Sequence, residues 1–133
     1  MTDVTIEVDF PGGKRVNARV GDFVIATDQS VKAGGDASAP EPFDLFLASI
    51  ASCAGIYALN FCQTRDIDAN GLGVRLECDR DEQTKRFSRM RLCLSLPDGF
   101  PEKYRAGIAR AVDLCTVKRT ILDGPEFQVV IDA

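Results

Sequence analysis

The sequence contains no histidine among its 133 residues. This absence excludes Cys-His and Ser-His-Asp nucleophile pairs, histidine-ligated metal sites and imidazole acid/base catalysis. The chain also has no CxxC pair, and Gly34-Gly35-Asp36 lacks the spacing of a phosphate-binding GxGxxG or GxxxxGK[ST] loop. The reactive side chains that remain are thiols, carboxylates and guanidinium groups.

The sequence also has little excess charge. Its 20 acidic and 16 basic residues are interspersed and give a formal net charge of -4 at pH 7. Such a chain lacks the basic patch that nucleic acid or an anionic membrane would require, so we expect neither as a partner. The alternation from Thr2 to Asp9 does not have the pattern of a secretion signal. The five cysteines form an odd set without a regular framework, and we expect a cytoplasmic protein with free thiols.

The length of 133 residues and the hydrophobic share of 45% are those of one ordinary globular domain. Such a domain can bury roughly two-thirds of its unfolded surface, enough for a core without disulfide bonds. We find no internal repeat, low-complexity tract or linker. The sequence therefore predicts a single domain over residues 1–133.

Residues 42–65 are the stretch around which we expect the fold to be organised. Pro42 suits a first helical position, and Asp44 faces the positive end of the helix dipole. Apolar residues follow helical spacing and continue around the opposite side, which is typical of a buried helix. The run is too interrupted by Ser, Gly and Asn to cross a membrane. Gly55, within a belt of small residues, indicates close approach by a second helix, the same helix of another subunit, or a substrate.

Alternating patterns predict strands on both sides of this helix. We expect strands at 2–9, 15–20, 23–26, 74–78, 90–96 and 127–131, a loop at 27–41, and further helices at 101–112 and 113–122. The order βββ-α-ββ-αα-β indicates an α+β fold with a mainly antiparallel sheet around a long buried central helix.

The five cysteines differ in their expected surroundings. Cys62, Cys78 and Cys93 have the pattern of small core residues. With Asp113 as a helix cap, Cys115 would occupy the first turn, where the helix dipole favours a thiolate, although Asp113 itself opposes this. Cys53, in the middle of an apolar helix, would be inert unless a cation reaches it. For Cys53 and Cys115, local reasoning leaves a reactive thiol and a buried structural cysteine equally open.

Two segments carry a resemblance to a known family. Pro-Phe-Asp-Leu-Phe-Leu-Ala-Ser-Ile-Ala-Ser-Cys, at 42–53, and Cys-Thr-Val-Lys-Arg-Thr-Ile, at 115–121, resemble the two cysteine-bearing helices of the OsmC/Ohr family, the osmotically inducible and organic-hydroperoxide-resistance proteins. The match extends over most of the chain. It implies an OsmC-like fold and an intertwined homodimer with active sites at the subunit interface.

The resemblance implies a thiol peroxidase of the oxidative stress response that reduces hydroperoxides, preferably organic ones, without metal or cofactor. Cys53 would be the peroxidatic thiol that forms a sulfenic acid, and Cys115 the resolving thiol that converts it to a disulfide. A dithiol reductant would regenerate the pair. We assign the peroxidatic role to Cys53, as the resemblance implies, rather than to Cys115, which the local helix-cap argument favours. An arginine that folding brings to Cys53 from a distant segment cannot be detected from the residues around it.

In family members an arginine and a glutamate activate the peroxidatic cysteine. At the glutamate position this chain has Asp44, one methylene shorter. The arginine comes from the first strands, where Arg15 and Arg19 both qualify, and we choose Arg15. Two other functions remain open: a non-catalytic dimeric binding protein for a small hydrophobic ligand, and a thiol redox sensor whose disulfide is the output.

Overall fold

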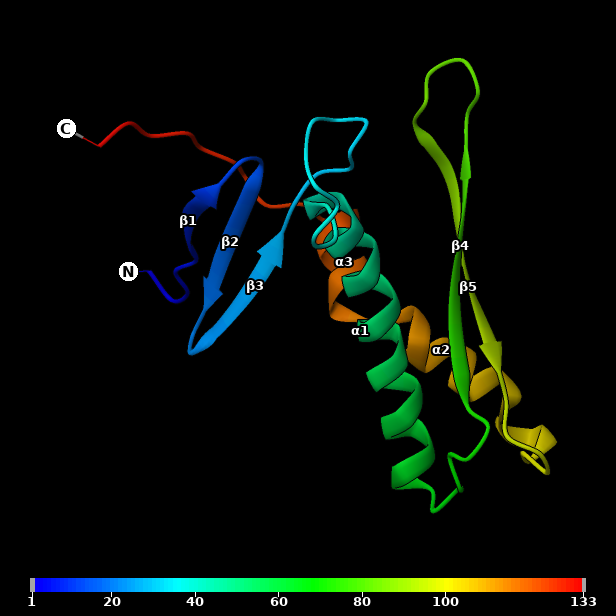
Figure 1. Cartoon of the computed structure of the whole chain (residues 1–133). Coiled ribbons are helices and arrows are strands. Elements are labelled where there is room, and N and C mark those ends of the chain that lie inside the picture. The colour runs from blue at the N-terminus through cyan, green and yellow to red at the C-terminus, as the bar shows by residue number, and fades with distance from the viewer. Residues whose placement is uncertain (1, 133) are drawn as a thin grey trace. The chain divides into compact units, whose positions relative to one another are not determined.

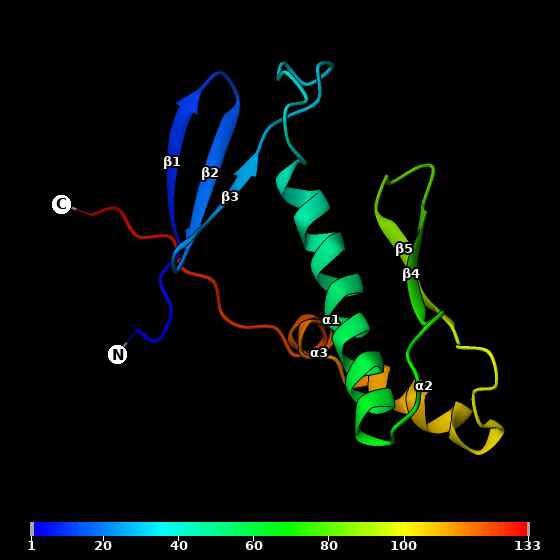
Figure 2. The same ribbon diagram turned by 60° about the horizontal axis from the view of Figure 1, so that its bottom comes forward.

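The computed structural model describes residues 2–132. It divides the chain into two compact units, Met1–Leu47 and Ala48–Ala133, so that the boundary falls within the long helix α1, Pro42–Thr64. Figures 1 and 2 show the elements of each unit. The predicted long central helix and antiparallel strands are present. The strands form two separate antiparallel sheets rather than one.

The first unit contains a three-stranded antiparallel sheet in the order β1-β2-β3 (Figure 1). Its strands are β1, Glu7–Gly12, β2, Arg15–Val20, and β3, Phe23–Thr27. The prediction for β2 is confirmed, whereas β1 begins later than the alternation from Thr2 indicates. At the end of the sheet, the Thr27 hydroxyl donates to the carbonyl of Val16 at 2.6 Å.

A buried carboxylate organises the loop that leads from β3 to α1. Asp28 is fully buried, and its Oδ2 accepts hydrogen bonds from the Ser38 hydroxyl at 2.6 Å and the Ser38 and Asp36 amides at 3.0 and 3.3 Å. Its Oδ1 accepts from the Gln29 amide at 2.7 Å. A Cβ at Gly35 would lie 2.2 Å from the Gln29 carbonyl oxygen, so only glycine fits there. The loop is therefore tightly packed around one side chain.

The second unit combines the remainder of α1 with a hairpin and two helices. The hairpin strands are β4, Gly73–Arg80, and β5, Phe87–Ser95, and a short 3-10 helix η1, Glu102–Tyr104, leads into α2, Arg105–Asp113, and then α3, Thr116–Leu122. Both views show α1 running beside the β4–β5 hairpin, with α2 across the second half of α1 (Figures 1 and 2). This arrangement places the core between α1, α2 and the hairpin.

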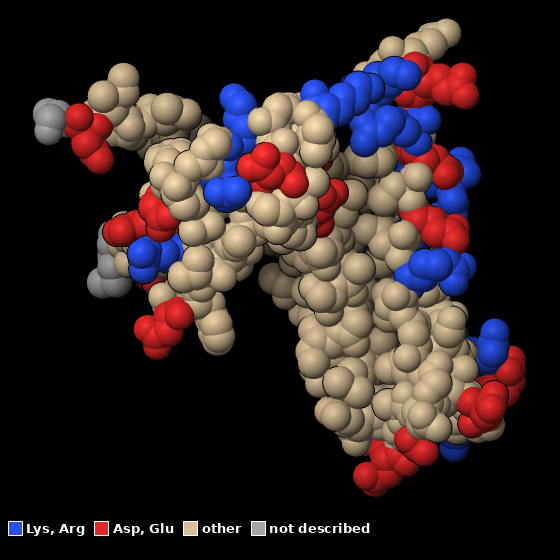
Figure 3. Space-filling model, in the orientation of Figure 1, with Lys and Arg blue, Asp and Glu red and all other residues tan. Residues whose placement is uncertain are grey.

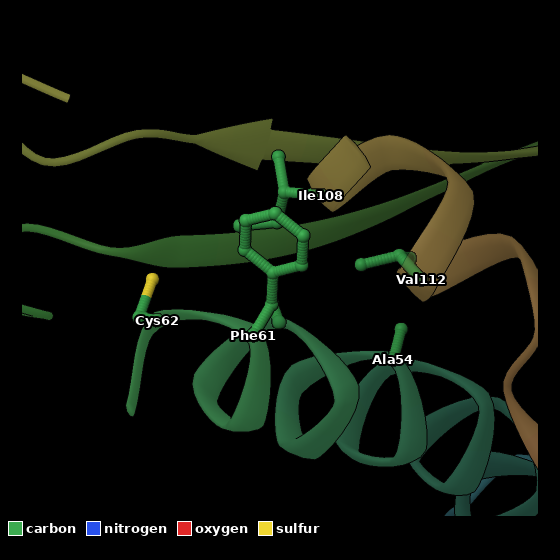
Figure 4. Packing of buried hydrophobic residues seen from close by; sticks show 6 residues of the cluster. Ala54, Phe61, Cys62, Ile108 and Val112 are labelled. Carbon is green, nitrogen blue, oxygen red and sulfur yellow. The ribbon is translucent and has the colours of Figure 1, made fainter. Parts of the chain in front are cut away.

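Phe61 is the centre of this core. It projects from α1 towards Ile108 and Val112 of α2 (Figure 4), and its ring meets Tyr104 edge-on at 5.9 Å. A Cβ at Gly107 would lie 3.1 Å from the Phe61 ring, so glycine leaves room for the ring against α2. Burial of a phenylalanine side chain stabilises a fold by about 1.5–3 kcal/mol. The buried cluster consists of Ala54, Ala58, Phe61, Cys62, Ile108 and Val112.

Charged residues lie along the hairpin, away from this core. Figure 3 shows basic and acidic side chains interspersed over β4 and β5, beside a largely uncharged surface. Arg91 donates to both carboxylate oxygens of Asp79, at 2.6 and 3.1 Å, and its guanidinium holds the pKa of that carboxyl below its usual range. The cross-strand register Glu77↔Arg91 and Asp79↔Arg89 sets this alternation of sign.

Only one face of α1 is buried within the chain, which corrects the expectation of burial on all sides. Its buried residues are Ile50, Ala54, Ala58, Phe61 and Cys62. Length and composition alone would allow α1 to cross a membrane, but all of these residues except Ile50 belong to the core cluster, so α1 is a core helix. At Gly55, no described residue outside the helix has an atom within 4 Å of the position that a Cβ would take. Among the described residues, no second helix therefore makes the close approach predicted at Gly55, and approach by another subunit or a substrate stays a prediction.

The prediction of a last strand at 127–131 is wrong. Residues 123–132 form no strand, and the side chains of Phe127, Val129, Val130 and Ile131 are exposed. An alternating apolar segment becomes a strand only when a sheet edge is available to pair with it. In the described chain this segment pairs with no edge.

We predict that Asp28→Asn lowers the free energy of unfolding at pH 7. The NH2 group of asparagine would face the hydroxyl and amide of Ser38, which both donate to the Asp28 carboxylate, so these hydrogen bonds would be lost. Hydrogen bonds, that of the Ser38 hydroxyl above all, lower the pKa of Asp28 from 3.8 to about 2. A depressed pKa means that the carboxylate stabilises the fold fully above pH 3.8 and progressively less as the pH falls towards 2.

Thermal unfolding of wild type, Asp28→Asn and Asp36→Asn, followed by circular dichroism between pH 2 and 7, measures this effect. Asp36, an exposed carboxylate of the same loop, is the control. The melting temperatures of Asp28→Asn and wild type should differ most at pH 7 and converge near pH 2. Equal melting temperatures at pH 7 would contradict the role of Asp28.

Candidate active site

Cys53 lies at the middle of α1, in the second unit, and is half-buried. The next residue, Ala54, is fully buried against α2, which fixes the rotation of this part of the helix. Residues four apart lie on the same helical face, so Tyr57 is the neighbour of Cys53 one turn further along. Cys53 is thus held at the edge of the core rather than inside it.

Cys115 lies between α2 and α3 and is fully buried. It is the N-cap of α3, and its Sγ accepts a hydrogen bond from the Lys118 amide at 3.4 Å. The expectation that Asp113 caps this helix is therefore wrong: Asp113 ends α2, and its carboxylate pairs with the Lys118 ammonium group. The chain bends between the two helices, and Cys115 takes the capping position because it is the last residue before α3.

A hydrogen bond joins the surroundings of the two cysteines. The Tyr57 hydroxyl lies 2.8 Å from Oγ1 of Thr116, and either oxygen can donate. Tyr57 is one helical turn from Cys53, and Thr116 directly follows Cys115. The structure therefore brings the helix that carries Cys53 and the helix capped by Cys115 into direct contact. Tyr57 was not singled out from the sequence, and its spacing of four residues from Cys53 is the one local signal that points to it.

Arg15, Arg19 and Asp44 lie in the first unit, and each has a local partner. The Arg15 guanidinium pairs with Asp36 at 3.1 Å, and Arg19 pairs with Asp9 at 3.6 Å. The Asp44 carboxylate accepts a hydrogen bond from the Glu41 amide at 2.9 Å, so it caps the start of α1. This is the first-turn role that its position indicates. The roles of Arg15 and Asp44 beside Cys53 remain predictions.

The other cysteines have structural surroundings. Cys62 is fully buried in the core, and burial raises the pKa of its thiol, which Arg65 opposes more weakly. Cys78 lies opposite Met90 and Cys93 opposite Arg75 in the β4–β5 ladder, so they occupy different register positions. Among residues 2–132, no group of three or more Cys, Asp or Glu side chains could hold a metal ion.

An apolar cavity of about 340 Å³ lies in the second unit. Ile50 of α1 and Leu92 and Leu94 of β5 line it, and Asp113 and Lys118 contribute its charged side chains. Its other lining residues are Leu76, Met90, Ala109, Val112 and Ile121. The lining is thus predominantly apolar, with an ion pair from the segment that holds Cys115.

The chain thus combines an α+β fold with one cysteine on its core helix and a second cysteine that caps a later helix. The sequence model of the OsmC-like protein family matches residues 34–130, which include both cysteines. The chain belongs to the OsmC-like protein family. No curated protein matches it at a significant level of similarity.

Solved structures show the same fold. An osmotic stress induced and detoxification response protein from Psychrobacter arcticus 273-4 superposes with a TM-score of 0.75 at 21% identity, covering 90% of this chain and 89% of that one. An OsmC-like protein from Mycoplasma pneumoniae gives a TM-score of 0.71 at 16% identity, covering 91% and 88%. An organic hydroperoxide resistance protein OsmC from Legionella pneumophila gives 0.58 at 16% identity, covering 91% and 90%.

We predict that a thiol-alkylating reagent modifies Cys53, Cys78 and Cys93 of the native protein much faster than Cys62 and Cys115. The first three thiols are partly exposed, whereas the last two are fully buried. For Cys62, the raised pKa also lowers the thiolate fraction at pH 8.

Peptide mass spectrometry after timed labelling with iodoacetamide measures these rates, with protein unfolded in guanidinium chloride as the control. All five sites should react at similar rates once the protein is unfolded. Native labelling of Cys62 or Cys115 at the unfolded rate would contradict the burial described here.

Proposed function

We propose that this protein is an OsmC-type hydroperoxide reductase that uses Cys53 and Cys115. The observation that carries the proposal is the contact of Tyr57 with Thr116, which links the neighbourhoods of the two cysteines within one compact unit. Membership of the OsmC-like family supports it, as does the hydroperoxide-resistance protein among the similar structures.

In this mechanism the Cys53 thiolate attacks an oxygen of the hydroperoxide and the O–O bond breaks. The Cys53 sulfur becomes a sulfenic acid, and the other oxygen leaves with a proton as an alcohol. The Cys115 thiol then attacks the sulfenic sulfur, forming a disulfide and releasing water. A dithiol reductant returns two electrons and two protons, so that both thiols are regenerated and the reductant becomes a disulfide.

The Cys115 thiol is well placed for the second of these steps rather than the first. It is fully buried and engaged with the Lys118 amide, whereas Cys53 is accessible to solvent. A peroxide arriving from solution therefore meets Cys53 before Cys115. This agrees with the roles that the family resemblance implies.

We further propose that Arg15 and Asp44 supply the cation and the carboxylate that activate Cys53, and that residues 1–133 act as one OsmC-like domain in a cytoplasmic homodimer. A second copy of the chain would cover apolar side chains that this chain leaves exposed. They include Val4, Ile6, Phe10 and Phe23 in the first unit and Phe127 and Ile131 in the second. Isolated exposed apolar residues are common, but such a number favours an interface.

A second candidate function is the binding of a small hydrophobic ligand. The cavity of about 340 Å³, lined mainly by leucine, isoleucine and valine side chains, favours it. Its volume lies in the range of small-molecule sites, and its ion pair could orient a polar end group. The two functions differ in a simple way: the binding protein would not consume peroxide.

We expect Cys53→Ser to abolish consumption of cumene hydroperoxide with dithiothreitol as the reductant, because no other thiol takes its place. Cys115→Ser should still form the sulfenic acid but produce no intramolecular disulfide. Cys93→Ser, a partly exposed cysteine outside the proposed pair, is the matched control and should retain wild-type turnover.

The consumption of peroxide is followed by a colorimetric hydroperoxide assay. Turnover in Cys53→Ser equal to that of wild type would contradict the proposal. A wild-type protein that consumes no peroxide would favour the ligand-binding function, which native mass spectrometry of the purified protein would then examine.

We expect Arg15→Met to slow oxidation of Cys53 by about tenfold or more, since loss of a neighbouring cation disfavours the attacking thiolate. Arg19→Met, which removes the same charge from the same strand, should change the rate by less than about twofold. Stopped-flow measurement of thiol loss with cumene hydroperoxide gives both rates. The reverse order of effects would assign the cation to Arg19 instead.

A further inference from the structure

The proposed reaction requires that two sulfur atoms on different elements meet after the first step. A disulfide needs Cα atoms about 4.4–6.8 Å apart, and a sulfenic acid that waits too long is oxidised further by a second peroxide. The segment that carries Cys115 must therefore be held against α1 during the interval. Packing of Val112 in the core positions the end of α2. It leaves the direction of the chain after Leu114 to be set by other contacts.

The hydrogen bond between Tyr57 and Thr116 is such a contact. Thr116 is the first residue of α3, and its Cα is one peptide unit, about 3.8 Å, from that of Cys115. Tyr57 is half-buried on α1. Side chains on a helix lean towards the helix N-terminus, so the Tyr57 side chain leans over the preceding turn, which carries Cys53. The Tyr57 hydroxyl thus holds the start of α3 against the turn of α1 on which the sulfenic acid forms.

We propose that Tyr57 and Thr116 are a positioning pair that sets the rate at which Cys115 resolves the Cys53 sulfenic acid. The inference rests on the proposed function and adds a competition between two fates of the Cys53 sulfenic acid. The sulfenic acid either condenses with Cys115, releasing water, or its sulfur attacks a second hydroperoxide, whose O–O bond breaks to give a sulfinic acid and an alcohol. Neither Tyr57 nor Thr116 takes part in a bond-making step, so their loss leaves the first oxidation of Cys53 unchanged.

The chain offers matched variants for a test. Tyr57→Phe and Thr116→Val each remove one hydroxyl of the pair, and Thr116→Ser keeps the hydroxyl while removing a methyl group. Thr120→Val makes the same chemical change one turn along α3, where the hydroxyl donates to the carbonyl of Thr116, whereas the Tyr57 hydroxyl bonds to the Thr116 side chain. All four are conservative changes, and circular dichroism of each variant is the check that it is folded.

Each protein is mixed with one and with twenty equivalents of cumene hydroperoxide in stopped-flow experiments, and the products are mapped by peptide mass spectrometry. Tyr57→Phe and Thr116→Val should form the disulfide between about twofold and tenfold more slowly, the worth of one neutral hydrogen bond. Their sulfinic acid fraction at high peroxide should rise correspondingly. Thr116→Ser and Thr120→Val should match wild type, and the first oxidation of Cys53 should be equal in all five proteins.

Wild-type partition in Tyr57→Phe and Thr116→Val, with a disulfide still formed, would overturn the positioning pair and leave the proposed function intact. An equal rise of sulfinic acid in Thr120→Val would also overturn it, since general weakening of α3 would then be sufficient. A wild-type protein whose Cys53 does not react would overturn the proposed function and this inference together.

Discussion

The second unit depends on the contact between α1 and α2, where Ala54, Ala58 and Phe61 meet Ile108 and Val112. The absence of a Cβ at Gly107 leaves room for the Phe61 ring against α2. Truncation of a buried phenylalanine costs about 3–5 kcal/mol, a large part of the stability of a small domain. Because Cys53 adjoins Ala54 and Cys115 follows Val112 closely in sequence, the same contact determines where both thiols lie.

The two thiols differ in exposure although they are near the same core. Cys115 is fully buried as the cap of α3, whereas Cys53 is half-buried on an otherwise apolar helix. This difference suits a reaction in which one thiol meets the peroxide and the other waits inside. Oxidation of Cys115 would also change the Sγ that accepts the Lys118 amide, so that the redox state of the pair and the start of α3 are linked.

Much of this fold was predictable from the sequence, because its signals are local. The bounds of β2 follow from alternation between two turns, and α1 follows from Pro42 and helical spacing. The tail at 127–131 was not predictable in the same way, because its alternation is sufficient for a strand only if an edge is present. The cap of α3 depends on where α2 ends. The sequence pattern predicts that the next helix begins at Asp113, whereas α2 extends to Asp113 and α3 begins after its cap, Cys115.

The candidate site shows the same division. Family motifs indicated both cysteines, but the partner of Tyr57 lies 59 residues away and no pattern of spacing reveals it.

The most direct test of the proposed function is to identify the product formed when the reduced protein reacts with one equivalent of cumene hydroperoxide or hydrogen peroxide. The account predicts a faster reaction with the organic peroxide that ends in a disulfide between Cys53 and Cys115. Thiol loss as slow as that of a free cysteine, with no such disulfide, would contradict it.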